Sequence, residues 1–169
     1  MKIFMPLFAA LLACAAVPAL AAESTADATV AAPAEPAKPA GYLDRARELT
    51  IHALALIGVN YKWGSDSPEH GFDCSGLVGH VFQEVAGVVL PRNSQGMSKV
   101  GAKIDKSDLQ PGDIVFFNTR RRPFSHVGIY IGEERFVHAP RRGREVEVQS
   151  MQGGYWKTRY NGARRVVSD

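Results

Sequence analysis

The chain has 169 residues, of which 46% are hydrophobic and 22% charged, a composition typical of one globular domain with short additional segments. Its formal net charge of +3, from 20 Lys and Arg against 17 Asp and Glu, is too small to favour nucleic acid as a partner. Beyond the N-terminal segment, no apolar stretch is long enough to span a bilayer. Two arginine clusters, residues 120–122 and residues 141, 142 and 144, are interpreted as solvated loop tips, with binding to an anionic polymer as the alternative.

Residues 1–22 have the pattern of a signal peptide. Lys2 supplies the positively charged N-terminal region, and residues 3–14 form the apolar region. Ala19-Leu20-Ala21 has the small-x-small pattern of a cleavage site. Residues 11–14, LLAC, also resemble a bacterial lipoprotein box, in which Cys14 is lipidated and becomes the mature N-terminus. Both interpretations predict export to the periplasm or cell envelope, and the second adds an outer-membrane lipid anchor through Cys14.

Residues 23–41 predict a disordered tether. They are Ala, Pro and small polar residues, with too little apolar surface to offset the entropy lost on ordering. The folded domain is therefore expected over residues 42–169.

Two helices are predicted in the first half of this domain. In the first, apolar residues recur every three or four positions before Gly58: Leu43, Ala46, Leu49, Ala53, Leu54 and Ile57. The second starts near Cys74, with Asp73 at the N-cap position, and ends at Gly87. We expect Gly76 to keep space open beside the Cys74 sulfur.

The second half of the domain predicts an antiparallel sheet, which makes the fold class α+β with helices packed on one side. Strands are expected at residues 114–117, 125–131, 135–139, 144–148 and 163–167. A three-residue loop at 132–134 would place His138 opposite Gly128, on the same face of the sheet as His126. A shift of one residue in the pairing would separate the two histidines.

Cys74 is the cysteine of the folded part, and neither interpretation of the N-terminus leaves Cys14 to form a disulfide with it. At the first turn of a helix, the macrodipole and backbone N–H groups favour the reactive thiolate, although a small buried hydrophobe is the plainer interpretation. A nucleophilic cysteine needs a base, and His126 and His138 are the candidates, unless each is an ordinary strand histidine. Zinc bound by these three residues is the other alternative, but their spacing matches no metal motif.

Five blocks of the sequence together resemble the NlpC/P60 family of bacterial cell-wall cysteine peptidases. They occur in the order and spacing of that family and cover about residues 42–167. The blocks are YKWGSDSPEHGFDCSGLVGHVFQEVAGVVLPRNS, LQPGDIVFFN, SHVGIYIG, FVHAP and ARRV.

The resemblance implies a papain-like fold for a catalytic domain at 42–169, with the helix that bears the nucleophile packed on an antiparallel sheet. It implies that Cys74 is the nucleophile, that His126 is the general base and then the acid, and that His138 orients the His126 ring. Tyr61 corresponds to a family tyrosine that reaches toward the thiol and supports the oxyanion.

The same resemblance gives substrate contacts to Asp73 and Ser75, with helix capping as their alternative role. Trp63 is expected to contribute packing rather than ligand contact. Ser65 and Met97 depart from residues common in the family, a glycine and a glutamine, and leave the substrate preference open.

The function implied is that of a peptidoglycan endopeptidase. It would cleave amide bonds next to diaminopimelate, either γ-D-Glu–diaminopimelate or D-Ala–diaminopimelate, through a cysteine thioester and without a cofactor or metal. The partners would be peptidoglycan stem peptides, acted on by a monomer. A non-catalytic wall-binding module, or an amidase or acyltransferase on the same papain-like scaffold, is the alternative.

Overall fold

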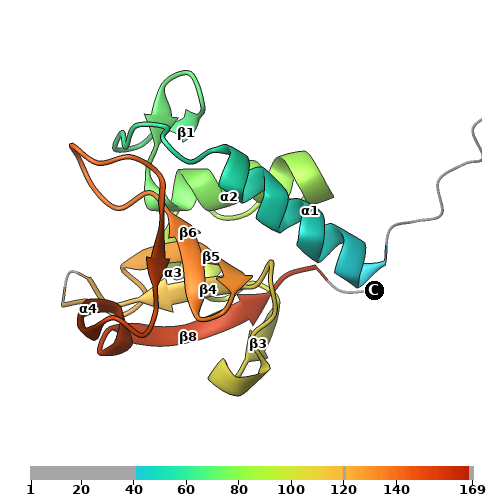
Figure 1. Ribbon diagram of the computed structural model, residues 1–169. Helices are drawn as coiled ribbons and strands as arrows, with labels where there is room; N and C mark the ends of the chain where they lie inside the picture. The colour runs from blue at the N-terminus through green and yellow to red at the C-terminus, as the bar shows by residue number, and fades with distance from the viewer. Residues whose placement is uncertain (1–40, 120, 168–169) are drawn as a thin grey trace, which may run out of the picture. The chain divides into compact units, whose positions relative to one another are not determined.

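The computed structural model describes residues 41–119 and 121–167 (Figure 1). The predicted signal peptide, Cys14 with its lipid anchor, and the tether up to residue 40 lie outside the described residues. In the described part of the chain, no helix combines the length and apolar character needed to cross a membrane.

The described residues form four α-helices, one 3-10 helix and eight strands. In chain order they are α1 (Tyr42–Ala55), β1 (Asp66–Ser67), β2 (Gly71–Phe72), α2 (Cys74–Ala86), α3 (Ser94–Met97), β3 (Ala102–Ile104), η1 (Lys106–Asp108), β4 (Ile114–Phe117), β5 (His126–Gly132), β6 (Arg135–His138), β7 (Glu147–Ser150), α4 (Gly154–Lys157) and β8 (Tyr160–Arg165). The two predicted helices are present, and each predicted strand overlaps an observed one, although β7 begins three residues later and β8 three residues earlier than predicted. The short elements β1, β2, α3, β3, η1 and α4 were not predicted.

Six strands form one antiparallel sheet in the order β3-β8-β4-β5-β6-β7, and β1 and β2 form a separate hairpin. Helices α1 and α2 pack together on one side of the large sheet (Figure 1). The predicted α+β class, with helices on one side of an antiparallel sheet, is thus confirmed.

Alternation along the strands separates two apolar cores, one on each face of the sheet. Val127 and Ile129 of β5 face α2, where they meet its fully buried residues Leu77, Val78, Val81 and Phe82. The other face carries Phe117 and Phe136, which pack against Trp156 of α4. His126 and His138 belong to this second face, because they alternate with the residues that point to α2.

The buried stripe of α1 is narrower than predicted. Ala46, Leu49 and Ala53 are buried as expected. Leu43, Leu54 and Ile57 are instead 76%, 37% and 47% exposed. Leu43 lies in the first helical turn, Ile57 lies beyond the helix end at Ala55, and residue 54 is rotated by about 100° from residue 53.

The register between β5 and β6 places His138 on the face of His126, as predicted, because Ile129 pairs with Val137. The connection itself differs from the prediction. Only residues 133 and 134 separate the strands, both with positive φ, and a bulge at the end of β5 takes up the odd residue. Without this bulge the pairing would slip by one residue and His138 would turn to the opposite face.

Candidate active site

Cys74 is the first residue of α2 and follows directly after the N-cap, Asp73. Its side chain is partly buried, and it is a thiol rather than half of a disulfide in the described part of the chain. Because the first N–H groups of a helix point outward along its axis, the start of α2 favours negative charge on the sulfur or beside it.

The Asp73 carboxylate holds the start of α2. It accepts hydrogen bonds from Gly76 N at 2.8 Å, Ser75 Oγ at 2.9 Å, Gly64 N at 2.9 Å and Arg92 Nη1 at 2.8 Å. Burial by itself raises the pKa of Asp73, but the hydrogen bonds and the Arg92 charge outweigh it, so the pKa is lowered. Asp73 is therefore a buried anion, and the capping role predicted for it is confirmed.

Arg92 was not identified from the sequence, although it connects three segments of the site. Its guanidinium contacts Asp73 and Ser75 at the start of α2, and Nη2 donates to the carbonyl oxygen of Ser65 at 2.7 Å. The Ser75 hydroxyl, 2.9 Å from both the Asp73 carboxylate and this guanidinium, is fixed between them. The Pro91-Arg92 dipeptide was the available signal, but its partners lie 17 to 27 residues away in sequence.

Gly76 serves a purpose different from the one predicted. A Cβ atom at this position would come within 2.2 Å of the Ser65 carbonyl oxygen and 2.8 Å of Arg92 Nη2. The missing side chain therefore lets the loop at Ser65 approach the helix backbone, and it does not clear space beside the Cys74 sulfur.

His126 begins β5 and His138 ends β6, and their rings meet edge to face. Nε2 of His126 lies 2.8 Å from Nδ1 of His138, a hydrogen bond between side chains that are almost fully buried. Trp156 of α4 stacks on the His126 ring, with centroids 5.4 Å apart and planes 28° apart. Because His138 occupies Nε2, the other ring nitrogen, Nδ1, is the atom of His126 that can act on a neighbouring group.

Burial lowers the pKa of His138 well below its ordinary value, and the positive charges of His126 and Arg144 lower it further. His138 is therefore neutral at physiological pH. Among residues 41–119 and 121–167, its buried Nε2 has no hydrogen-bond partner, and the nearest carboxylate oxygen, Oε1 of Glu147, is 3.9 Å away. A neutral imidazole in this position can accept a hydrogen bond from Nε2–H of His126 at its Nδ1 while it keeps its own proton on Nε2.

A groove of about 490 Å³ brings most of the predicted residues together, and we call it the Cys74 groove. Its lining includes Tyr61, Asp73, Cys74, Ser75 and His126, while His138 lies behind His126. Tyr61 is held by its backbone, which donates to the Arg144 carbonyl oxygen at 2.8 Å and bridges to Phe72.

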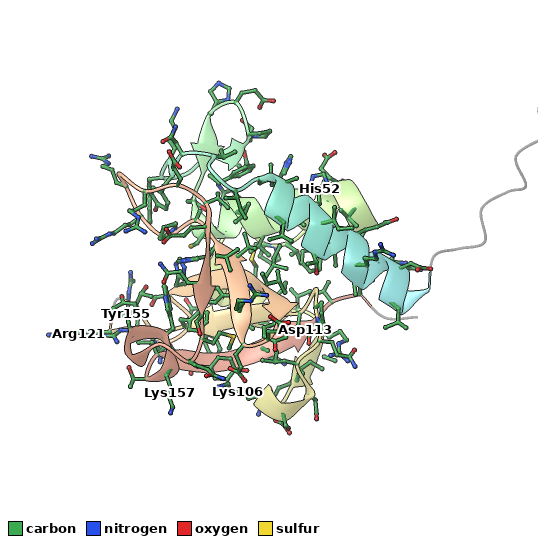
Figure 2. All side chains as sticks on the ribbon, in the orientation of Figure 1. His52, Lys106, Asp113, Arg121, Tyr155 and Lys157 are labelled. Carbon is green, nitrogen blue, oxygen red and sulfur yellow. The ribbon has the colours of Figure 1, made fainter. Side chains whose placement is uncertain are left out.

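Trp63 also lines the Cys74 groove and is 67% exposed, so the expectation that it packs inside the domain was wrong. The loop at residues 62–65 turns it outward. The other histidines lie elsewhere: His52 and His80 face each other 5.9 Å apart, and His70 contacts Ser67. Figure 2 shows His52 on α1, well away from Tyr155 on α4, the helix that also carries Trp156.

Within residues 41–119 and 121–167, no three His, Cys, Asp or Glu side chains gather in a way that could hold a metal ion. The arrangement of Cys74 and His126 in one groove, with His126 backed by a neutral histidine, instead suits nucleophilic attack by sulfur with proton transfer through the imidazole.

The profile of the NlpC/P60 family matches residues 58–165. The chain is 41% identical over 118 residues to murein DD-endopeptidase MepH of Escherichia coli, covering 68% of this chain and 44% of that protein. It is 44% identical over 114 residues to gamma-DL-glutamyl hydrolase of Bacillus subtilis, covering 67% of this chain and 27% of that protein. The matches thus span less than half the length of both relatives.

The fold is shared with solved NlpC/P60 structures. An NlpC/P60 family protein from Bacillus cereus superposes with a TM-score of 0.66 at 35% identity, over 72% of this chain and 40% of that one. The papain-like arrangement expected from the sequence is therefore confirmed as the fold of this domain.

We predict different effects of alanine at two glycines three residues apart in α2. Gly76→Ala should destabilise the protein by about 2 kcal/mol or more, because its Cβ would collide with backbone at Ser65. Gly79→Ala is the matched control: its Cβ would lie 3.8 Å from Met97 Cε, and it should be neutral or stabilise by about 0.5–1 kcal/mol. Urea unfolding of both variants measures this, and an equal effect would contradict the role assigned to Gly76.

We also predict that His138 makes the fold sensitive to acid. In the unfolded chain it binds a proton near its ordinary pKa of 6.5, whereas in the folded protein its pKa is lowered. The unfolded state therefore binds more protons than the folded state below pH 6.5, and this contribution to stability is lost as the pH falls further. His138→Gln should lose less stability than the wild type between pH 7 and pH 5.

Thermal melting across this pH range provides the measurement. His70→Gln, a change at an exposed loop position, is the control and should keep the wild-type slope. Identical slopes for wild type and His138→Gln would show that the buried histidine is not the source of the acid sensitivity.

Proposed function

Because the chain belongs to the NlpC/P60 family, we propose that it is a cysteine endopeptidase of peptidoglycan. Its substrates are the stem peptides or their cross-links, cut at an amide bond next to diaminopimelate. The observation that carries this proposal is the Cys74 groove, where a thiol at a helix start shares a cavity with His126 and His126 is bonded to buried His138. The names of the relatives, a murein DD-endopeptidase and a gamma-DL-glutamyl hydrolase, support the same substrate class.

The reaction proceeds through a thioester. His126 takes the Cys74 proton, and the thiolate attacks the carbonyl carbon of the scissile amide, moving an electron pair onto its oxygen. When the tetrahedral intermediate collapses, the C–N bond breaks and His126 donates the proton to the leaving nitrogen. His126 then takes a proton from water, whose oxygen attacks the thioester and releases the acid and the Cys74 thiol.

The negative oxygen of each tetrahedral intermediate needs hydrogen-bond donors, and two sources border the groove. The first turn of α2 supplies backbone N–H groups, and Tyr61 supplies a phenol hydroxyl. Removing one such donor costs about 10²–10³ in rate in enzymes of this kind. We assign Tyr61 this supporting role.

His138 acts on substrate only through His126. While His126 is doubly protonated, Nδ1 of neutral His138 accepts a hydrogen bond from its Nε2–H, which orients the ring and stabilises its charge. Asp73 and Ser75 border the same groove, so we propose that they contact substrate in addition to their structural bonds.

We further propose a domain organisation that matches this function. A signal peptide at 1–22 exports the protein, the tether at 23–41 spaces the catalytic domain at 42–169 from the export site, and the monomer works in the periplasm or cell envelope. Removal of the signal peptide at the Ala19-Leu20-Ala21 site is the favoured outcome, and lipidation of Cys14 is the alternative. Mass spectrometry of the mature N-terminus distinguishes them.

The full chain incubated with purified sacculi should release new muropeptides, with peptide ends created next to diaminopimelate. Cys74→Ala should lower the rate at least about 10³-fold and His126→Ala by a similar factor, because the two groups act as one unit. Liquid chromatography with mass spectrometry identifies the bond from the product masses. A wild-type profile equal to that of Cys74→Ala would remove the peptidase proposal.

The same products decide between the alternatives. A wall-binding module would pull down with sacculi and leave them uncut. An amidase would release sugar-free stem peptides, and an acyltransferase would leave a new acyl product on an added amine. Each pattern differs from the internal peptide cuts expected of an endopeptidase.

A further inference from the structure

A second hollow, of about 910 Å³, also borders His126. We call it the β7–α4 groove, since it is formed by β7, α4 and the loop that follows β6. Its lining includes Arg141, Arg144, residues 147–150, Tyr155 and Trp156. It meets the Cys74 groove at three shared residues: Thr119, His126 and Pro140.

The position of His126 indicates which half of the substrate lies in which of the two grooves. Cys74 borders only the first groove, whereas His126 borders both. In the proposed reaction the acyl carbon must reach Cys74, and the leaving nitrogen must reach the ring that protonates it. The acyl half of the substrate therefore occupies the Cys74 groove, and the fragment that leaves with the nitrogen extends into the β7–α4 groove.

The β7–α4 groove presents positive charge to that fragment. Arg144 is paired with the Glu147 carboxylate at 2.5 Å, and Glu147 also lines this groove. Arg141 is exposed and has no carboxylate partner among residues 41–119 and 121–167. A guanidinium at the mouth of a groove is suited to binding a carboxylate through two parallel hydrogen bonds.

We propose that Arg141 binds a carboxylate carried by the leaving fragment, and that the β7–α4 groove is a subsite for an acidic, amine-bearing leaving group. The inference rests on the proposed function, in which that fragment is diaminopimelate, a residue with carboxylates beside its amines. It replaces the interpretation of Arg141 as a solvated loop tip by a recognition role.

The test uses two peptides, each in two forms that differ in one group. A muropeptide dimer cross-linked through D-Ala–diaminopimelate and a γ-D-Glu–diaminopimelate tripeptide are each prepared with the diaminopimelate carboxyl free or as a carboxamide. The full wild-type chain should cleave the free-carboxyl form with a kcat/KM about tenfold higher, mainly through a lower KM.

Arg141→Ala should remove this preference, with an about tenfold loss on the free carboxyl and no change on the carboxamide. Arg142→Ala is the matched control, since this exposed arginine is adjacent but does not line the groove. Equal losses of Arg141→Ala on both substrates, the same loss in Arg142→Ala, or no preference in an active wild type would overturn the inference.

Binding gives a readout independent of turnover. meso-Diaminopimelate titrated into the Cys74→Ala chain should shift the NMR signal of the Trp156 indole, and a second change, Arg141→Ala, should abolish the shift. No shift in the Cys74→Ala chain would contradict the subsite. If the wild type cleaves neither peptide nor sacculi, the proposed function fails and the inference falls with it, whereas cleavage without carboxyl preference removes the inference alone.

Discussion

The chemistry proposed for this protein depends on one contact, the 2.8 Å hydrogen bond between Nε2 of His126 and Nδ1 of His138. Both rings are buried, so solvent cannot replace this bond, and burial together with nearby positive charge keeps His138 neutral. A neutral partner lets His126 gain and lose a proton without a second charge in the apolar wall. It also leaves Nδ1 of His126 as the atom directed to other chemistry.

The half of the site that carries Cys74 is held by charge-assisted hydrogen bonds. At the start of α2, the buried Asp73 carboxylate joins the helix, the loop at Gly64 and the Arg92 guanidinium through charge-assisted hydrogen bonds. Removing a single partner from such a network costs much folding stability, since the remaining polar groups are left buried without hydrogen-bond partners. The helix start is therefore rigid, which suits a nucleophile that must meet a carbonyl carbon in a defined direction.

The two halves come from opposite parts of the chain and meet along a continuous groove. The Cys74 groove and the β7–α4 groove share His126, so a substrate laid across both has its scissile bond beside the ring that handles the proton. The orientation of the substrate along the two grooves then follows from the order of the proposed reaction steps, and not from the shape of the grooves. In the loop after β6, Arg144 is paired with Glu147, whereas Arg141 is exposed, which is why we infer a recognition role for Arg141.

Local chemistry in the sequence determined helices α1 and α2, strands β4 to β8 and the capping of α2 by Asp73, because caps and alternation act over a few residues. The shared face of His126 and His138 could be proposed from alternation, but the pairing register with its bulge in β5 decided it. The five motif blocks determined the family and its papain-like fold. Only the tertiary structure decided the contacts between separate segments: Arg92 against Asp73, Trp156 over His126, and the Ser65 loop against Gly76. It also decided the exposure of Trp63. These features follow from packing between segments, which no local pattern contains.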